Sequence, residues 1–479
     1  MPNSLAKNSV FYLLYNVLRI AFPFLTGIYV SRVLLPESIG TVAAAQNLTQ
    51  YFVIFAFLGI PTYGLREISK VRNNPEEKNK VYSELFLINL ISTILFTCVY
   101  LVIVFSINSY RENLYLYLVT GISIALNAFN ISWLYEGLEE FKFMSIRNLV
   151  FKAVSFCFLI VFVKTEQDVL LYALVTVVGT AGNGIVNMVY APRFASLSFK
   201  DLNLRRHMKS IMYLVVVNLA IELYSLVDIT MMNFICSKDS IAFYKYGRSI
   251  ESILMQIVNT FTMVLVPRIS FYYKEKMYDE YNNLLSKGLK IIIFCGLPMI
   301  VGLYYTSDSL MTTFYGNQYI ASSLVLKILS LLLCISPIGY LLGSRVLLVV
   351  GRERMMVLPV GVGAVVNVVG NAIVIPIFAE VGAAMASVFS EIIVMVVYVN
   401  LGKKYFKLVE IWESTWKIGL ACFLMAIYLF CAEKINLNCW MTIGLKIIGA
   451  TIVYSLVLFL LREPVFREAF KKLKNKIKY

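Results

Sequence analysis

Apolar residues fill successive blocks of about 20 residues along the chain, and short polar segments separate the blocks. A helix of about that length crosses the hydrocarbon core of a bilayer. Strand-like alternation over about ten residues, the pattern of membrane barrels, does not occur. The pattern predicts about fourteen membrane-spanning helices, at residues 9–33, 39–62, 84–107, 114–137, 146–163, 169–191, 210–234, 249–269, 288–306, 324–349, 356–378, 383–401, 416–433 and 440–461.

The composition supports an all-α polytopic membrane protein. Of the 479 residues, 59% are hydrophobic and 15% are charged, whereas charged residues make up about 25% of a soluble domain. The first apolar block is too long for a signal peptide and has no small-residue cleavage site, so we expect it to remain as the first span.

Lysine and arginine predict the orientation. With the N-terminus in the cytoplasm, the inner loops and termini hold about 30 of the 43 basic residues and the outer loops hold about 7. We therefore expect a multi-pass membrane protein with both termini cytoplasmic. This distribution accounts for most of the net charge of +15 without a nucleic-acid partner. The basic, amphipathic tail is expected to lie on the inner leaflet or to be solvated.

Several chemistries are not supported by the sequence. His207 is the one histidine, no cysteine pair has C-x-x-C spacing, and no P-loop motif is present. The loops are too short to fold a catalytic domain. We therefore expect no enzyme activity, no metal site and no cofactor, apart from a coupling ion (H⁺ or Na⁺).

Polar residues form a stripe on the first span. Tyr12, Asn16 and Arg19 follow helical spacing and lie on one face. A charge at the centre of a bilayer costs about 2.5–3.5 kcal/mol on insertion scales. The stripe is therefore expected to face other helices or water rather than lipid.

Other spans carry similar polar residues. Each amide or hydroxyl taken alone has a second interpretation as interhelical hydrogen bonding worth about 0.6–2 kcal/mol, and Arg248 and Lys327 are close enough to span ends to reach the interface. The candidates for a substrate cavity, besides the first-span stripe, are Gln46, Gln50, Asn127, Arg248, Asn259, Lys327 and Arg345. The candidates for ion coupling are Asp228, Glu222 and Glu391.

Short internal matches suggest a duplication. Ser38-Ile39 and Ser240-Ile241 are separated by the same offset as Arg66 and Arg268. Parallel repeats around a central site are a recurrent plan of transporters. We predict two pseudo-symmetric six-helix lobes at 1–205 and 206–402, followed at 403–479 by a two-helix hairpin and the tail.

Four segments resemble Wzx-type oligosaccharide flippases. They are "YVSRVLLPESIGTVAAAQNLTQYF", "WLYEGLEEFKFMSIRN", "YSLVDITMM" and "LLVVGRERMMVLPVGVGAVVNVVGN". These flippases belong to the multidrug/oligosaccharidyl-lipid/polysaccharide exporter superfamily, with the multidrug and toxin extruders (MATE) and the lipid II flippase. The resemblance implies a MATE-like fold with a cation-rich central cavity that Arg19, Asp228 and Arg345 are expected to line.

The resemblance also implies a function in O-antigen or capsule assembly. An alternating-access flippase would move undecaprenyl-pyrophosphate-linked repeat units to the periplasmic face, with membrane lipid, a polysaccharide polymerase and chain-length machinery as partners. A multidrug or cation exporter, a lipid II flippase, a membrane-embedded glycan polymerase and a membrane scaffold remain as alternatives.

Overall fold

The computed structural model describes residues 22–409, 411–435 and 438–468, without the side chains of 213, 214 and 216–225. These residues form helices and connecting loops, with no strand among them. Eleven of the described helical segments are long and apolar enough to cross a membrane. The predicted all-α, multi-pass architecture is confirmed.

The predicted count of about fourteen spans stays a prediction. One of the eleven segments, Glu353–Tyr405, has 53 residues and contains two predicted spans, which meet where Ala379 has a φ of 48°. The predicted first span lies partly outside the described residues. The predicted seventh span lies within the helix Arg205–Ile235, of which Leu226–Ile235 is the apolar part with described side chains.

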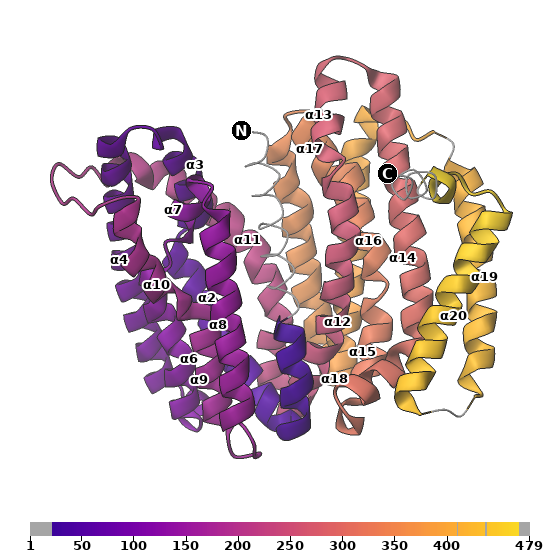
Figure 1. Cartoon of the computed structure of the whole chain (residues 1–479), viewed down its shortest axis with the longest axis horizontal. Helices are drawn as coiled ribbons and strands as arrows, with labels where there is room; N and C mark the ends of the chain where they lie inside the picture. Colours follow the sequence, from indigo (N-terminus) through magenta and orange to yellow (C-terminus); the bar gives the residue numbers. More distant parts are fainter. Residues whose placement is uncertain (1–21, 410, 436–437, 469–479) are drawn as a thin grey trace. The chain divides into compact units, whose positions relative to one another are not determined.

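The chain forms two compact units, Met1–Ala242 and Phe243–Tyr479, which are described separately here (Figure 1). Their boundary reflects packing, whereas the predicted lobes at 1–205 and 206–402 and the hairpin region at 403–479 rest on sequence repeats and stay a prediction.

Unit 1 consists of helices that pack mainly along their lengths, with α2 against α4, α6 and α11 and with α9 against α6 and α8. Its described elements are a helix at 22–33, α2 (Pro36–Phe57), α3 (Ile60–Val71), α4 (Pro75–Ser106), α5 (Asn108–Arg111), α6 (Leu114–Leu126), η1 (Asn127–Phe129), α7 (Ser132–Gly137), α8 (Phe141–Phe162), α9 (Val169–Ala181), α10 (Asn183–Tyr190), η2 (Ala191–Arg193) and α11 (Arg205–Ile235).

Unit 2 packs α14 against α15, α16, α19 and α20, and α18 against α15 and α16. The first residues of α12 belong to unit 1. The elements are α12 (Lys238–Met263), α13 (Val266–Lys274), α14 (Tyr278–Phe314), η3 (Asn317–Tyr319), α15 (Ser322–Leu329), α16 (Leu332–Gly339), the π-helical η4 (Tyr340–Arg345), α17 (Val346–Val349), η5 (Glu353–Met356), α18 (Val357–Gly402), η6 (Lys403–Tyr405), α19 (Ile411–Glu433) and α20 (Cys439–Leu460).

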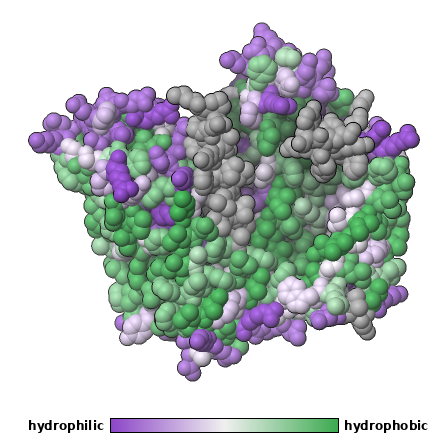
Figure 2. All heavy atoms as spheres, viewed as in Figure 1, coloured by the Kyte–Doolittle hydropathy of each residue, from purple (hydrophilic) through white to green (hydrophobic). Residues whose placement is uncertain are grey.

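Hydrophobic side chains cover the middle of the visible helices and hydrophilic ones gather at their ends (Figure 2). Many of these apolar residues are exposed, among them Ile94, Val102 and Phe423. An exposed apolar surface of this extent suits contact with lipid. The surface agrees with a membrane-spanning protein.

Candidate functional site

Three helices of unit 1 are interrupted. The helix of α2 and α3 breaks at Leu58 and Gly59, which have left-handed φ values of 48° and 69°. Between α6 and α7 the chain passes through the 3₁₀ turn η1. At Gly182 a turn separates α9 from α10, although this glycine keeps helical φ and ψ values of −62° and −25°. Non-helical backbone at membrane depth occurs where protein buries it or where it lines a cavity.

Side chains of α4 satisfy the backbone carbonyls at two of these breaks. Ser92 Oγ donates to the carbonyl of Ala56, at 2.5 Å, next to the first break. Asn89 Nδ2 donates to the carbonyls of Asn127, at 3.0 Å, and Ala128, at 3.3 Å. Asn89 is fully buried and Ser92 is 5% exposed. These bonds supply partners for three backbone carbonyls beside the breaks, as buried carbonyls require.

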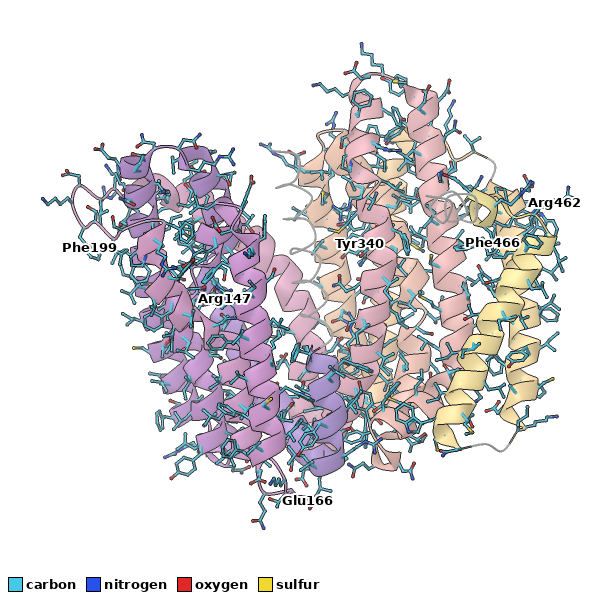
Figure 3. The ribbon with its side chains drawn as sticks, viewed as in Figure 1. Arg147, Glu166, Phe199, Tyr340, Arg462 and Phe466 are labelled. Carbon is cyan, nitrogen blue, oxygen red and sulfur yellow. The ribbon has the colours of Figure 1, made fainter. Side chains whose placement is uncertain are left out.

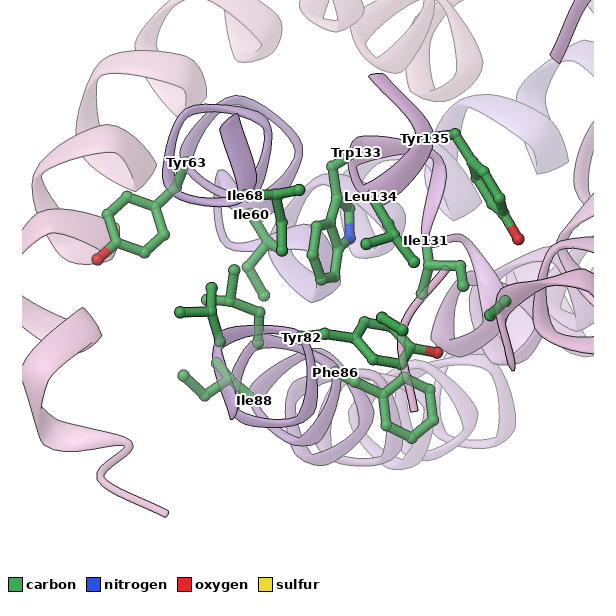
Figure 4. Packing of buried hydrophobic residues seen from close by; sticks show 14 of the residues in the cluster. Ile60, Tyr63, Ile68, Tyr82, Phe86, Ile88, Ile131, Trp133, Leu134 and Tyr135 are labelled. Carbon is green, nitrogen blue, oxygen red and sulfur yellow. The ribbon is translucent and has the colours of Figure 1, made fainter. Parts of the chain in front are cut away.

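A hydrophobic cluster holds the segments that follow the first two breaks. Trp133 of α7 packs against Ile68 of α3 and Tyr82 of α4 (Figure 4). The rings of Trp133 and Tyr82 are 6.0 Å apart, and Gly64 lets the indole approach the backbone of α3 closely. This cluster fixes where α3 and α7 begin and so fixes the positions of the breaks.

A pocket of about 340 Å³ lies beside the interrupted helices. Residues of α2, α6, η1 and α9 form it. They are Gln46, Thr49, Gln50, Val53, Phe57, Thr120, Ser123, Leu126, Asn127, Asn130, Thr176, Val177, Thr180 and Ala181. The structure therefore brings together three of the predicted cavity residues, namely Gln46, Gln50 and Asn127.

Amides and hydroxyls make up the polar part of the pocket wall. Among its described lining residues none is ionisable. Gln46 and Gln50 make no hydrogen bond to another described residue. Asn127 Nδ2 lies 3.4 Å from Thr93 Oγ1 and 3.5 Å from Asn89 Oδ1. Such a lining can hydrogen-bond a neutral polar ligand.

The opposite face of α2 contacts α11. Asn47 Nδ2 donates to Thr230 Oγ1 at 2.8 Å, and the Tyr51 hydroxyl lies 2.8 Å from the same oxygen. Asp228 is 7% exposed and acts electrostatically on Tyr51. Asp228 is thus a buried residue of unit 1, on a polar interface between helices.

Unit 2 contains a cluster of charged and polar residues. Arg248 NH1 lies 3.2 Å from Glu251 Oε2, and Ser336 Oγ donates to Glu391 Oε2 at 2.7 Å. Three predicted residues, Arg248, Arg345 and Glu391, act electrostatically on Tyr340, the first residue of η4 (Figure 3). Short π-helical segments often occur at functional sites.

The remaining predicted residues fall elsewhere. Asn259 is half-buried on α12. Lys327 pairs with Asp308, with Nζ 2.7 Å from Oδ2. Tyr12, Asn16 and Arg19 lie outside the described residues, as does the side chain of Glu222. Their proposed roles stay predictions.

Sequence reasoning missed several residues of both sites. Thr176 and Thr180 share a helix face with i, i+4 spacing, a signal that was available but not used. Glu251 lies three residues after Arg248 and is 1% exposed. Asn89 gave no signal, because only the tertiary structure places it beside the break in the next span. The described residues contain no cluster of metal-binding side chains.

Comparison with known proteins identifies the family. The model of the polysaccharide biosynthesis protein family matches residues 5–272, which is more than half of the chain. The chain belongs to this family. A second model, MatE, matches residues 214–373. The predicted membership of the multidrug/oligosaccharidyl-lipid/polysaccharide exporter superfamily, among the Wzx-type flippases, is confirmed.

Two relatives have names that refer to glycans. A protein of Shigella dysenteriae named as an O-antigen transporter is 21% identical over 392 residues, covering 81% of this chain and 98% of the relative. The capsular polysaccharide biosynthesis protein CapF of Staphylococcus aureus is 19% identical over 411 residues, covering 84% of this chain and 100% of CapF.

Solved structures share the fold. The lipid II flippase MurJ in an inward-closed conformation matches with a TM-score of 0.72 at 16% identity, over 96% of this chain and all of MurJ. An inward-facing MATE transporter matches with a TM-score of 0.63 at 12% identity, over 80% of this chain and 93% of the transporter. The predicted MATE-like fold is confirmed.

Proposed function

We propose that this member of the polysaccharide biosynthesis protein family is a flippase for lipid-linked oligosaccharide. It moves undecaprenyl-pyrophosphate-linked repeat units of O-antigen or capsule type from the cytoplasmic to the periplasmic face of the inner membrane by alternating access. The pocket of unit 1 carries the proposal, because its amides and hydroxyls, set in a largely apolar wall between membrane-spanning helices, suit a hydrophilic head group.

The head group has chemically different parts. Sugar hydroxyls need amide and hydroxyl partners, whereas a pyrophosphate needs cations, and arginine offers a planar set of donors for its oxygens. Amides and hydroxyls gather in the unit 1 pocket. The guanidinium groups of Arg248 and Arg345 belong to the unit 2 cluster and, with Arg19, are our candidates for the pyrophosphate.

Ion coupling requires a carboxylate whose protonation changes during the cycle. Glu391 and the newly identified Glu251 influence each other electrostatically, so binding a proton to one relieves its repulsion from the other. The guanidinium of Arg248 lies beside Glu251 and is released when Glu251 becomes neutral. We assign proton coupling to this pair, with Asp228 and Glu222 as further candidates.

The function is tested by complementation. The gene is deleted from its own host and restored on a plasmid, and surface polysaccharide is measured by gel and by antibody. We expect the deletion strain to lose the polysaccharide and to accumulate lipid-linked repeat units on the cytoplasmic face, with recovery on restoration. Normal surface polysaccharide in the deletion strain would refute the proposal.

Drug export by the same fold is the competing proposal. A site for cationic drugs needs acidic and aromatic side chains, but the described lining of the unit 1 pocket has one aromatic residue, Phe57, and no acid. We therefore expect the deletion strain to keep its normal sensitivity to cationic drugs. The same strain gives both measurements, so one experiment separates the two functions.

A further inference from the structure

The hydroxyl groups of the unit 1 pocket share one hydrogen-bonding arrangement. Each of the five lies within hydrogen-bond distance of a backbone carbonyl three or four residues earlier in its own helix, and Thr49 Oγ1 also lies 3.1 Å from Thr120 Oγ1. The bonds run from Thr49 to Ala45 (2.9 Å), Thr120 to Tyr117 (3.1 Å), Ser123 to Thr120 (2.6 Å), Thr176 to Tyr172 (2.8 Å) and Thr180 to Thr176 (2.8 Å).

These bonds decide what the pocket offers to a ligand. A hydroxyl that has given its proton away keeps oxygen lone pairs and can only accept. The Asn127 amide nitrogen is also engaged inside the protein, because it donates to Asn89 Oδ1 and Thr93 Oγ1. Among the described lining residues, the amide groups of Gln46, Gln50 and Asn130 keep donors for a ligand, and the Asn130 oxygen already accepts from Ser132. The described wall therefore offers neutral amides and hydroxyl oxygens and no cation.

A neutral wall selects its ligand. A carboxylate or phosphate would lose its hydration and find no cation in the described wall, at a high desolvation cost. A neutral sugar presents several hydroxyl protons that match the lone pairs. Its C–H face suits the apolar part of the wall, formed by Val53, Phe57, Leu126 and Val177.

The size of the pocket is consistent with part of a head group. Its volume of about 340 Å³ is at the small end of ligand sites in proteins, which run from about 300 to 1,000 Å³. One or two sugar rings fit, whereas a whole repeat unit with its pyrophosphate does not.

We infer that the unit 1 pocket is a subsite for an uncharged sugar of the repeat unit and that it excludes acidic sugars and phosphate. The inference rests on the proposed flippase function and adds its specificity. The transported glycan is therefore expected to carry an uncharged sugar at the position that enters the pocket.

Binding to the purified full-length protein in nanodiscs tests the inference. D-galactose and D-galacturonate form a matched pair that differs only at C6, and saturation-transfer NMR detects weak binding of either. We expect a signal from galactose and at least about tenfold less from galacturonate. Equal signals from the two sugars, or no signal from galactose, would overturn the inference.

Variants locate the binding to the pocket. The double variant Thr176→Val/Thr180→Val keeps the side-chain shape and removes two acceptors, so we expect galactose binding to weaken about tenfold. Thr41→Val is the matched control, because Thr41 makes the same backbone bond, to Glu37 at 2.8 Å, but lies outside the pocket. Unchanged binding in the double variant would also overturn the inference.

A gain of binding gives an independent result. Gln50→Lys adds a cation at an exposed lining residue, and we expect it to admit galacturonate. Surface polysaccharide in the complemented strain reports the flippase function separately. Recovery of polysaccharide by a protein that does not distinguish the two sugars would reject the subsite and leave the flippase intact.

Discussion

Asn89 provides the sharpest test of how the pocket is built. Its buried amide holds the carbonyls of Asn127 and Ala128 at the η1 break, through bonds of 3.0 and 3.3 Å. Asn89→Leu keeps the approximate volume and removes both donors. In the variant both carbonyls lose the Asn89 donor, although the Asn127 carbonyl keeps its bond from the Asn130 N–H, at 3.0 Å.

The size of the effect follows from the two bonds. An interhelical hydrogen bond in a membrane protein contributes about 0.6 kcal/mol on average and up to about 1.7, while an unsatisfied buried polar group costs about 1–3 kcal/mol. We therefore expect the free energy of unfolding to fall by about 1–3 kcal/mol. Reversible unfolding in mixed micelles measures it.

A neighbouring residue on α4 supplies the control. Thr97 Oγ1 is buried without a hydrogen-bond partner, so Thr97→Val is expected to leave the free energy of unfolding unchanged or to raise it slightly. A loss below about 0.5 kcal/mol in Asn89→Leu, with Thr97→Val unchanged, would refute the claim that Asn89 stabilises the break.

Three further predictions concern close packing, a buried ion cluster and coupling. A Cβ on Gly40 would lie 1.7 Å from the carbonyl oxygen of Lys238, so Gly40→Ala should reduce the yield of monodisperse protein. Gly361→Ala is the control, because no atom lies within 4 Å of its added Cβ. This control should stabilise its helix by up to about 1 kcal/mol. Glu84 is fully buried, and its carboxylate accepts hydrogen bonds from Arg206, His207 and the Asn203 backbone amide. A double-mutant cycle of Glu84→Gln with His207→Gln should give a coupling energy of about 0.5–3 kcal/mol. Additive changes in the free energy of unfolding would contradict direct contact between Glu84 and His207. Glu251→Gln should abolish the acceleration of flipping by a pH gradient in proteoliposomes, while the exposed Glu433→Gln should keep it; a sodium dependence instead would reject proton coupling.

The sequence determined the features that depend on solvent and on local pattern. A block of about 20 apolar residues forms a membrane helix, because lipid offers no hydrogen-bond partner and the helix satisfies its own backbone groups. Helical spacing also placed Gln46 and Gln50 on one face of a span, and both residues line the pocket. These conclusions needed only the period of one helix.

The tertiary structure decided what requires two or more helices at once. The breaks at Gly59 and η1 look like ordinary spans in the sequence, and they persist because Ser92 and Asn89 of another helix satisfy their carbonyls. The neutral character of the pocket wall depends on which side chains of several helices meet there, which composition does not reveal. Glu251 and Glu391 are 140 residues apart, and folding alone brings them within electrostatic range. Contacts between distant segments follow from packing, and the pattern of a single helix does not contain them.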